Sequence, residues 1–441
     1  MREGLDQQGG IWRFDDAVMF FCAGALVIAI SGLLLMLTIL LQQAKPHWWP
    51  MPVYHWSSES VQFHTVLGQS IFTDDSVVLV DQGILDRPDA RVVRLEKSLP
   101  GLRRQKPENA VLVQHKQFGR VFGFFEKIDS GALEFRDNHG ELRTVQLNDL
   151  DYWYLANQLS AAESWSIAAT NVIDFLRQGY ESDSQTRGVY PALVGTVVMV
   201  LLMTIFVMPL GVLAAVYLHE YAVDGYFTRL IRTGVHNLAA IPSVIYGVFG
   251  LGLFVYGFGG ELDRLIYSST LPAPTFGEPG LLWASLTLAL LTLPVVIVAT
   301  EEGLARIPRS IVEASYALGA TRAETLLKLV LPLTAPAMMT GLILAIARAA
   351  GEVAPLMLVG VVEFAPTLPV KAEFPFLALD QKFMHLGHQI FDLGFQSLDS
   401  SSVQARVYAT ALVLFVIVVA LNGLAVVLRH RLNRRYHDLL R

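Results

Sequence analysis

The amino-acid sequence predicts an all-α integral membrane protein of six transmembrane helices, with a small water-soluble insert after the first helix. Two observations lead to this fold class. The 441-residue chain is 53% hydrophobic and only 16% charged, whereas soluble domains carry about 25% charged residues. Its apolar residues are also gathered into uninterrupted runs, so the excess apolar material requires a bilayer.

The first apolar run, Ala17–Leu41, contains no charged residue. A membrane span needs about 20 apolar residues, whereas the apolar part of a secretory signal has about 7–15. The run also lacks a small-residue cleavage site followed by a polar start. We therefore expect a retained anchor. The single cysteine, Cys22, lies within this run, so the chain cannot form an intrachain disulfide.

Further apolar runs are long enough to span a bilayer. They are Pro191–Leu218, Val235–Phe258, Leu281–Ala299, Ala335–Val362 and Tyr408–Leu428. Several contain proline, which membrane helices tolerate when neighbouring helices satisfy the freed carbonyl groups. A packed bundle of bent helices is expected.

Basic residues are distributed unevenly between the two sides of these spans. With the N-terminus inside, the inner segments hold Arg2, Arg13, Arg229, Arg232, Arg306, Arg309, Arg322, Lys328, Arg429, Arg431, Arg434, Arg435 and Arg441. The two shorter outer segments hold only Arg264, Lys371, Lys382 and Arg406. Since cytoplasmic segments carry the excess of Lys and Arg, both termini are predicted to face the cytoplasm.

The chain is expected to divide into three parts. Residues 1–44 form a cytoplasmic tail and the first transmembrane helix, residues 45–189 a soluble insert outside the membrane, and residues 190–441 a core with five transmembrane helices. The insert is rich in charged residues, which a bilayer excludes.

The insert is predicted to be a small mixed α/β domain. Short strands are expected at Val77–Val80, Val111–Val113 and Val121–Phe125, and a hairpin joins Leu133–Arg136 to Glu141–Gln146 through the polar residues 137–140. Ser160 and Glu163 have capping-box spacing and predict a helix that continues to Gln178. No pattern in the insert indicates its function.

The segment between the fourth and fifth spans has the pattern of two short helices that meet at a corner. Ser310 with Glu313, and Thr321 with Glu324, have capping-box spacing. Gly319 lies between them, where a helix end favours a residue that can adopt positive φ. The second helix is apolar and is expected to end at Pro332. The segment is either a projection that docks into a groove on a partner, or an amphipathic connector resting on lipid headgroups.

The spacing of this segment resembles the EAA loop of ABC-importer permeases. The family pattern is Glu-Ala-Ala, three residues, Gly, nine residues and Ile-x-Leu-Pro. Here Glu313-Ala314-Ser315, Gly319 and Leu329-Val330-Leu331-Pro332 occupy it, with Ser315 and Leu329 as the departures. The resemblance implies the fold of a type I importer permease.

In that family the loop, here residues 301–333, couples the membrane helices to an ATPase subunit. The implied coupling residues are Glu313, Ala314, Gly319, Leu331 and Pro332. Because the chain lacks a Gly-x4-Gly-Lys-Ser/Thr phosphate loop, we expect it to be no enzyme, with ATP and Mg²⁺ bound by a partner ATPase.

Three stretches resemble the A-type permease subunit of phosphate-specific ABC transporters, in its long form with an outer insert. They are Ala239–Gly247, Ala299–Leu304 and Ala347–Leu356, where Val353 replaces the usual Thr. The resemblance covers about Pro191–Leu428. It implies inorganic phosphate as the substrate and the bacterial inner membrane as the location. It also implies an ABC ATPase dimer, a second related permease and an outer phosphate-binding protein as partners.

Arg348 is expected near the middle of the fifth span, with Glu352 four residues further on the same helical face. A charge at that depth costs roughly 2.5–3.5 kcal/mol on insertion scales, so it should face the bundle interior or a wet cavity. A guanidinium group suits phosphate oxygens. The pair is therefore either part of the substrate path or an ion pair that holds helices together.

Other functions remain to be weighed. A permease for another oxyanion, such as molybdate or sulfate, would carry the same loop. A membrane sensor with an outer sensing domain predicts a cytoplasmic signalling domain, and the short segment after Leu428 does not resemble one. No nucleophile, metal-ligand or acid–base pattern indicates a membrane enzyme.

Overall fold

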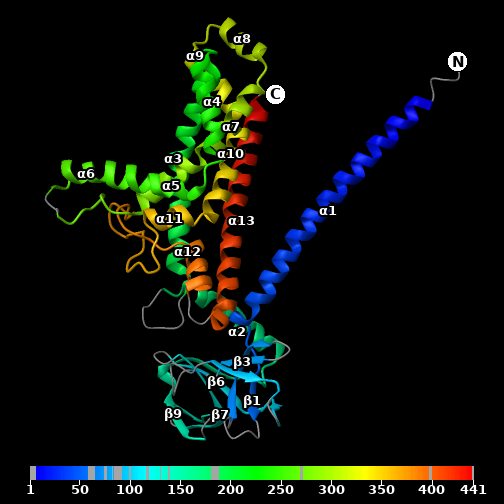
Figure 1. Ribbon diagram of the computed structural model, residues 1–441, viewed down its shortest axis with the longest axis vertical. Coiled ribbons are helices and arrows are strands. Elements are labelled where there is room, and N and C mark those ends of the chain that lie inside the picture. Colours follow the sequence, from blue (N-terminus) through cyan, green and yellow to red (C-terminus); the bar gives the residue numbers. More distant parts are fainter. Residues whose placement is uncertain are drawn as a thin grey trace.

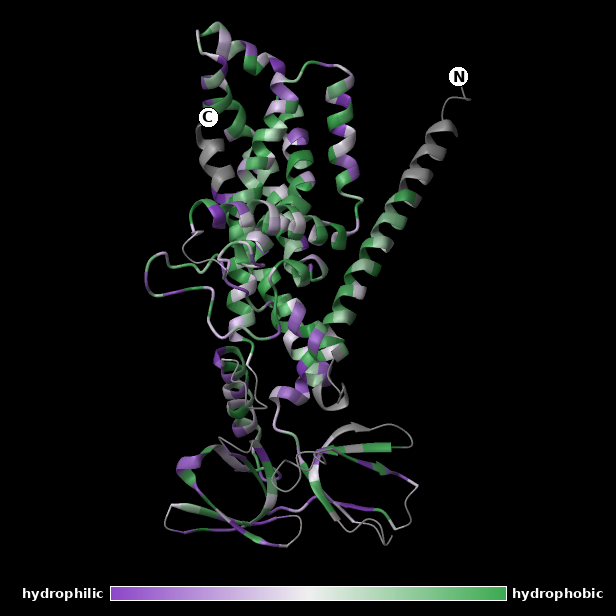
Figure 2. Ribbon diagram, turned by 60° about the vertical axis from the view of Figure 1, so that its left-hand side comes forward, coloured by the Kyte–Doolittle hydropathy of each residue, from purple (hydrophilic) through white to green (hydrophobic). Residues whose placement is uncertain are grey.

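A computed structural model describes residues 6–57, 65–73, 77–81, 83, 92–98, 101–115, 119–129, 131–137, 140–179, 188–268, 272–396 and 400–439. A helical bundle makes up most of the molecule, and a β domain lies beyond one end of it (Figure 1). Hydrophobic residues cover the bundle helices, whereas hydrophilic residues are frequent in the β domain (Figure 2). The predicted turn residues Asn138 and His139, and the basic residues Arg2 and Arg441, lie outside the described residues.

The predicted six spans are confirmed. Among the described residues, six helical segments are long and apolar enough to cross a membrane: Val18–Trp48, Tyr190–Tyr221, Ser243–Leu265, Leu281–Ala305, Arg322–Gly351 and Gln404–Arg431. They belong to α1 (Asp6–Trp48), α3 (Tyr190–Val216) with η3 (Tyr217–Tyr221), α5 (Ser243–Phe249), η4 (Gly250–Gly259), α6 (Gly260–Leu265), α7 (Leu281–Ala305), α9 (Arg322–Thr325), η6 (Leu326–Val330), α10 (Leu331–Gly351) and α13 (Ser400–Leu439).

The bundle core lies between α3, α7, α10 and α13. Its buried side chains include Met199, Met203 and Leu288. Glycine allows close approach of α3 to α7, because a Cβ at Gly211 would come within 2.6 Å of the Val296 side chain. The hydroxyl groups of buried threonines donate hydrogen bonds to carbonyl oxygens of their own helix. Thr292 Oγ1, for example, donates to Leu288 O at 2.8 Å. The core therefore leaves few polar groups exposed to the apolar surroundings.

Two predicted spans are interrupted. The run Val235–Phe258 begins inside a separate amphipathic helix, α4 (Tyr226–Leu238), and the chain turns before α5 begins at Ser243. The run Ala335–Val362 breaks at Glu352 and Val353, before α11 (Ala354–Val359). Each break precedes or contains a proline, which lacks the N–H donor and disfavours helix in the residue before it. The segment α5–η4–α6 extends sideways from the bundle (Figure 1).

The insert is β-rich, with one helix after its strands. The described strands are β1 (Val53–Ser57), β2 (Thr65–Thr73), β3 (Val77–Asp81), β4 (Val92–Glu96), β5 (Arg103–Gln105), β6 (Ala110–His115), β7 (Gly119–Asp129), β8 (Ala132–Arg136), β9 (Leu142–Gln146) and β10 (Leu150–Leu155). They form two five-stranded sheets, ordered β4-β3-β2-β1-β5 and β10-β6-β7-β8-β9. A short 3₁₀ turn, η2 (Leu147–Asp149), precedes β10.

The predicted features of the insert are present. The hairpin β8–β9 pairs Leu133 with Val145, and helix α2 (Ala161–Arg177) begins with the predicted Ser160–Glu163 capping box. The sheets are joined by Asn157, whose side-chain amide donates to Val53 O at 2.8 Å and to Pro107 O at 2.7 Å. Strands dominate because apolar residues alternate along them, whereas only α2 has a helical pattern.

An aromatic cluster attaches α2 to the end of α1. The rings of His47 and Phe175 lie 4.6 Å apart, and those of Trp49 and Trp165 lie 5.0 Å apart. Asn171 Nδ2 also donates to Trp48 O at 2.8 Å. Beyond this cluster α1 diverges from the bundle (Figure 1), and the most apolar 18-residue stretch of its span has no buried residue. The insert is therefore fixed to α1 through α2.

Candidate functional site

The end of α8 (Arg309–Ala317) is closed by a Schellman motif. Gly319 has φ +86°, and its N–H donates to Tyr316 O at 2.9 Å, while Ala320 N–H donates to Ser315 O at 3.2 Å. These two bonds satisfy helix-end carbonyls that would otherwise lack donors. The predicted positive φ of Gly319 at the helix end is confirmed, and glycine suits this φ because other residues are strained there.

The next helix begins at once. Thr321 Oγ1 accepts from Glu324 N at 3.3 Å, and the Glu324 carboxylate accepts from Thr321 N at 3.0 Å. This is the second predicted capping box. The hydroxyl groups of Ser315 and Thr325 meet across the corner at 2.9 Å. We call the segment Arg309–Thr325 the corner; its two helix ends are joined by side-chain as well as backbone bonds.

Two other predictions for the corner are wrong. Ser310 is not an N-cap, because α8 begins directly after Pro308, which occupies the cap position without a side-chain bond. Pro332 does not end the second helix. It lies just after the π-helical segment η6, inside a helix that continues although the proline removes one backbone hydrogen bond. The helix instead runs through α9 and η6 into α10 without interruption, from Arg322 to Gly351.

The corner lies at the end of the bundle opposite the β domain, the end toward which α13 runs (Figure 1). Its most exposed apolar side chain is Leu318, 89% exposed, at the turn between the helices. Glu313 and Ala314 are also exposed on α8, whereas Leu331 and Pro332 are half-buried at the start of α10. Two of the predicted coupling residues are therefore exposed on α8, and two are half-buried at the start of α10.

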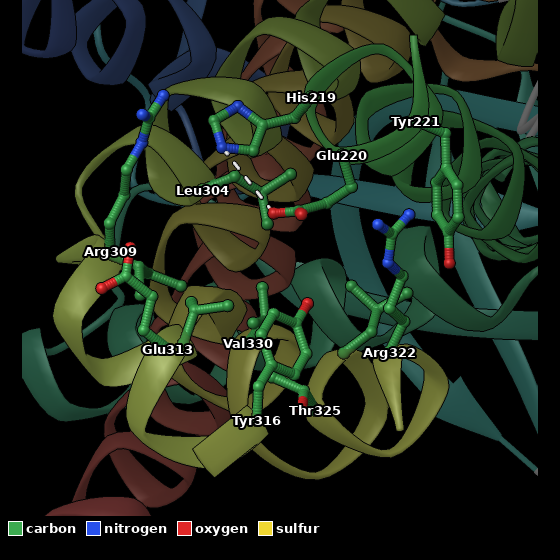
Figure 3. A pocket seen from close by; sticks show the side chains of 13 residues that line it. His219, Glu220, Tyr221, Leu304, Arg309, Glu313, Tyr316, Arg322, Thr325 and Val330 are labelled. Atoms are coloured by element: carbon green, nitrogen blue, oxygen red, sulfur yellow. Dashed lines mark ion pairs between the residues drawn. The ribbon is translucent and has the colours of Figure 1, made fainter. Parts of the chain in front are cut away.

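A cavity of about 330 Å³ lies between the corner and the bundle. Glu313 and Arg309 of α8 and Arg322 of α9 face it from the corner, while His219 and Glu220 face it from the end of α3 (Figure 3). His219 Nε2 and Glu220 Oε1 lie 3.8 Å apart. The corner is thus attached through its two helices and is not packed tightly against the end of α3.

The stretch Ala299–Leu304 lies at the end of α7 beside this corner. Glu301 Oε1 lies 3.5 Å from Arg232 Nε of α4. Arg232 also donates through Nη2 to Leu218 O at 3.0 Å, at the end of α3. One arginine therefore ties together three helices near the corner, a role that sequence analysis missed because Arg232 was read only as an inner positive charge.

Arg348 lies in the last turn of α10 and not in the middle of a span, because the helix ends at Gly351. Its Nε is 3.5 Å from Glu352 Oε1, and the two side chains are 33% and 22% exposed. Among the described residues, Glu352 is the sole hydrogen-bond or ion-pair partner of the Arg348 guanidinium. The pair is confirmed, and part of the guanidinium remains open to a ligand.

Helix α5 packs against the break that carries this pair. A Cβ at Gly247 would lie 2.7 Å from Pro355 Cα, so only glycine permits the approach. Tyr246 OH donates to Leu238 O at 2.7 Å, which fixes the turn between α4 and α5. Two of the stretches that resemble the phosphate-specific permeases, residues 239–247 and 347–356, are therefore in contact at two helix breaks.

Sequence analysis missed the exposed Leu318 and the Ser315–Thr325 bond. The position of Leu318, directly before the glycine at the end of α8, would have been enough to predict an exposed apolar side chain at the turn. The hydroxyl pair had no such signal, because its members are joined only by the fold of the corner.

The chain matches the family described as binding-protein-dependent transport system inner membrane component over residues 207–436. It is 37% identical over 174 residues to the phosphate transport system permease protein PstA 1 of Mycobacterium tuberculosis, covering 39% of this chain and 51% of that protein. It is 32% identical to a probable PstA of Methanocaldococcus jannaschii, covering 42% and 59%. It is 31% identical to the phosphate transport system permease protein PstC of Pasteurella multocida, covering 43% and 62%.

The chain spans about half the length of the curated relatives it matches first. The family match includes α7, the corner, α10 and most of α13, so it contains the helices that position both candidate sites. Because that match covers more than half of the 441 residues, the chain belongs to the family of binding-protein-dependent transport system inner membrane components.

Proposed function

We propose that this chain is a membrane-spanning subunit of an ATP-driven importer that moves inorganic phosphate across the bacterial inner membrane. The chain is a permease subunit and not an enzyme. The observation that carries the proposal is the corner, a projection with an exposed Leu318 at the end of the bundle opposite the β domain. A separate ATPase subunit docks there.

The helix from Arg322 to Gly351 supplies a mechanical link. It contains 30 residues, and at about 1.5 Å per residue it extends roughly 45 Å. The corner lies at one end and Arg348 in the last turn at the other. A displacement of the corner by ATPase closure therefore moves Arg348 as part of one rigid element, which is a rigid-body transition of the type that alternating access needs.

The proposed partners are those of a binding-protein-dependent transport system. An ABC ATPase dimer, which holds ATP and Mg²⁺, docks on the corner from the cytoplasm, and the basic residues around it support that orientation. A second related permease completes the pathway, and a phosphate-binding protein delivers solute on the side of the insert. Both termini are then cytoplasmic, and the β domain lies outside the membrane.

Two observations support phosphate as the solute: the names of the relatives and the chemistry of the Arg348 site. Relatives of both the PstA and the PstC type are named as phosphate permeases. A half-buried guanidinium can hold two phosphate oxygens at once, and its single carboxylate partner can be exchanged for the solute. Sulfate or molybdate would fit the same fork, so direct competition between these anions separates the alternatives.

The experiment that tests the coupling role uses Leu318→Asp. Leu318 is 89% exposed, so the change should leave the fold intact while it places a charge in an apolar ATPase groove. We expect ATPase subunits to be lost from the purified complex and uptake to cease. Leu142→Asp, at a 55% exposed leucine of the insert, is the matched control and should retain both. Normal ATPase retention by Leu318→Asp would overturn the assignment.

A further inference from the structure

A small pocket lies at the insert end of the bundle, far from the corner. It is formed by helix α12 (Leu386–Phe391), η7 (Asp392–Gln396) and the chain around Val362 and Glu363. Its volume is about 10 Å³, close to the space that one water molecule needs. The floor of the pocket is fixed to α3, because Leu386 N donates to Thr196 Oγ1 at 3.0 Å.

Three polar side chains that line this pocket are almost fully buried. His385 is 1% exposed, His388 8% and Gln389 7%. Among the described residues, His385 Nε2, His388 Nδ1 and both amide atoms of Gln389 have no hydrogen-bond partner. A buried polar group without a partner is costly, and native proteins satisfy such groups with protein or water. Four unsatisfied atoms on residues that line one small space therefore indicate a site for a polar ligand.

The hydrogen-bond pattern of His385 decides the kind of ligand. Its Nδ1 accepts from Gly387 N at 3.1 Å, so in the neutral ring Nε2 carries the proton and donates. A metal ion cannot bind at a protonated nitrogen. The described residues also hold no group of three His, Cys, Asp or Glu side chains arranged for a metal. The carboxylates of Glu363 and Asp392 line the same pocket and would repel an anion.

We propose that this pocket binds a single water molecule, which forms hydrogen bonds with His385, His388 and Gln389. The water would stabilise the packing of α12 against the chain at Val362 and Glu363. The water accepts from His385 Nε2 and from the Gln389 amide nitrogen, and it donates to Gln389 Oε1 or His388 Nδ1. Two to four polar partners are what a buried water requires.

The sign of a stability change tests this proposal. If the pocket is dry, Gln389→Met removes two unsatisfied atoms and keeps the side-chain length, so the thermal midpoint should rise or stay constant. If water is bound, the same change removes its partners and leaves His385 unsatisfied. We expect the midpoint of the purified full chain in lipid nanodiscs to fall by about 2 °C or more. Gln158→Met, at an exposed glutamine of the insert, is the control and should change little.

Two further measurements keep the test decisive if Gln389→Met fails to assemble. A high-resolution structure of the full complex should show one density peak within hydrogen-bond distance of His385 Nε2 and Gln389. EDTA should leave the midpoint of the unmodified chain unchanged. An unchanged or raised midpoint in Gln389→Met, or an empty pocket, would overturn the proposal, and a midpoint lowered by EDTA would assign a metal ion instead of water.

Discussion

The hydroxyl groups of Ser315 and Thr325 lie 2.9 Å apart across the turn between α8 and α9. Thr325 is 2% exposed, so the bond is shielded from water on one side. Ser315 is the position at which the chain departs from the usual Glu-Ala-Ala pattern, and its extra oxygen joins the two helices of the corner. The departure therefore adds a contact to the corner where a plain alanine would make none.

Loss of this bond should loosen the corner without removing it. A hydrogen bond contributes about 1 kcal/mol, so Ser315→Ala and Thr325→Val should each speed local hydrogen exchange of residues 318–320 about fivefold. The double variant should be no faster than the faster single variant, because both changes remove the same bond. Exchange detected by mass spectrometry measures this.

Ser310→Ala is the matched control for that experiment. Ser310 lies on the same helix, is exposed and makes no capping bond, so its replacement should leave exchange unchanged. Simple additivity of the two single effects would show that Ser315 and Thr325 act independently.

The role of the Arg348–Glu352 pair can be tested by removing one or both of its charges. Arg348→Gln should abolish phosphate uptake if the guanidinium contacts the solute, and Arg348→Lys should restore only part, since an ammonium group lacks the planar fork. If Arg348 only neutralises Glu352, the double variant Arg348→Gln with Glu352→Gln should recover function, because a neutral pair avoids a lone buried charge. Uptake of labelled phosphate at matched protein levels distinguishes the two roles. Near-normal uptake by the double variant would show that Arg348 does not contact the solute.

Stability should fall in mild acid because of the buried histidines. Burial lowers the pKa of His385 to about 3, with the nearby His388 adding to the effect. Burial also lowers the pKa of His388, while Asp392 and Glu363 oppose the shift. In the unfolded chain both titrate near 6.5. Below that pH the unfolded state binds more protons, so stability present above pH 6.5 is lost as the pH falls, by up to about 1.4 kcal/mol per pH unit for each histidine.

Thermal midpoints measured at pH 7.5, 6.5 and 5.5 check this dependence. His385→Asn keeps a side-chain acceptor at the start of α12 and removes the titrating ring, so its midpoint should depend less steeply on pH. An equally steep dependence in this variant would place the proton uptake elsewhere.

The amount of membrane-inserted protein left after deletion of the insert should depend on which residues are deleted. Without residues 53–157 the chain keeps α2 and its contacts with the end of α1, and the bundle should still insert, because its spans satisfy their own backbone hydrogen bonds. Removal of residues 53–187 also deletes Phe175, which packs with Ala44, Leu386 and Leu412, and should destabilise the bundle. Membrane-inserted protein after detergent extraction measures both. Equal yields of the two variants would show that α2 contributes nothing to the core.

Hydropathy was enough to predict the spans, and spacing was enough to predict the Gly319 turn and the Thr321–Glu324 capping box, since each depends on local residues. The helix breaks before Ser243 and at Glu352 were not foreseen, because membrane helices often continue through proline. Whether a proline ends a helix depends on its neighbours, here the contact of Gly247 with Pro355. The Ser310 capping box was predicted wrongly because Pro308 already sets the start of α8.

The contacts that assemble the candidate sites needed the structure. Arg232 and Glu301 are far apart in the sequence, and only the packing of α4 on α7 brings them to 3.5 Å. No sequence pattern singles out His385 and Gln389, yet both are buried and line a pocket. Long-range burial of this kind has no periodic signature.

The central claim, that the chain carries phosphate into the cell under the control of a docked ATPase, is tested most directly by uptake into proteoliposomes. The complete complex is reconstituted with the phosphate-binding protein on the side of the insert and ATP on the side of the corner. We predict ATP-dependent accumulation of labelled phosphate that excess unlabelled phosphate suppresses and excess sulfate or molybdate does not. Suppression by sulfate or molybdate, or accumulation that does not require ATP, would contradict the account.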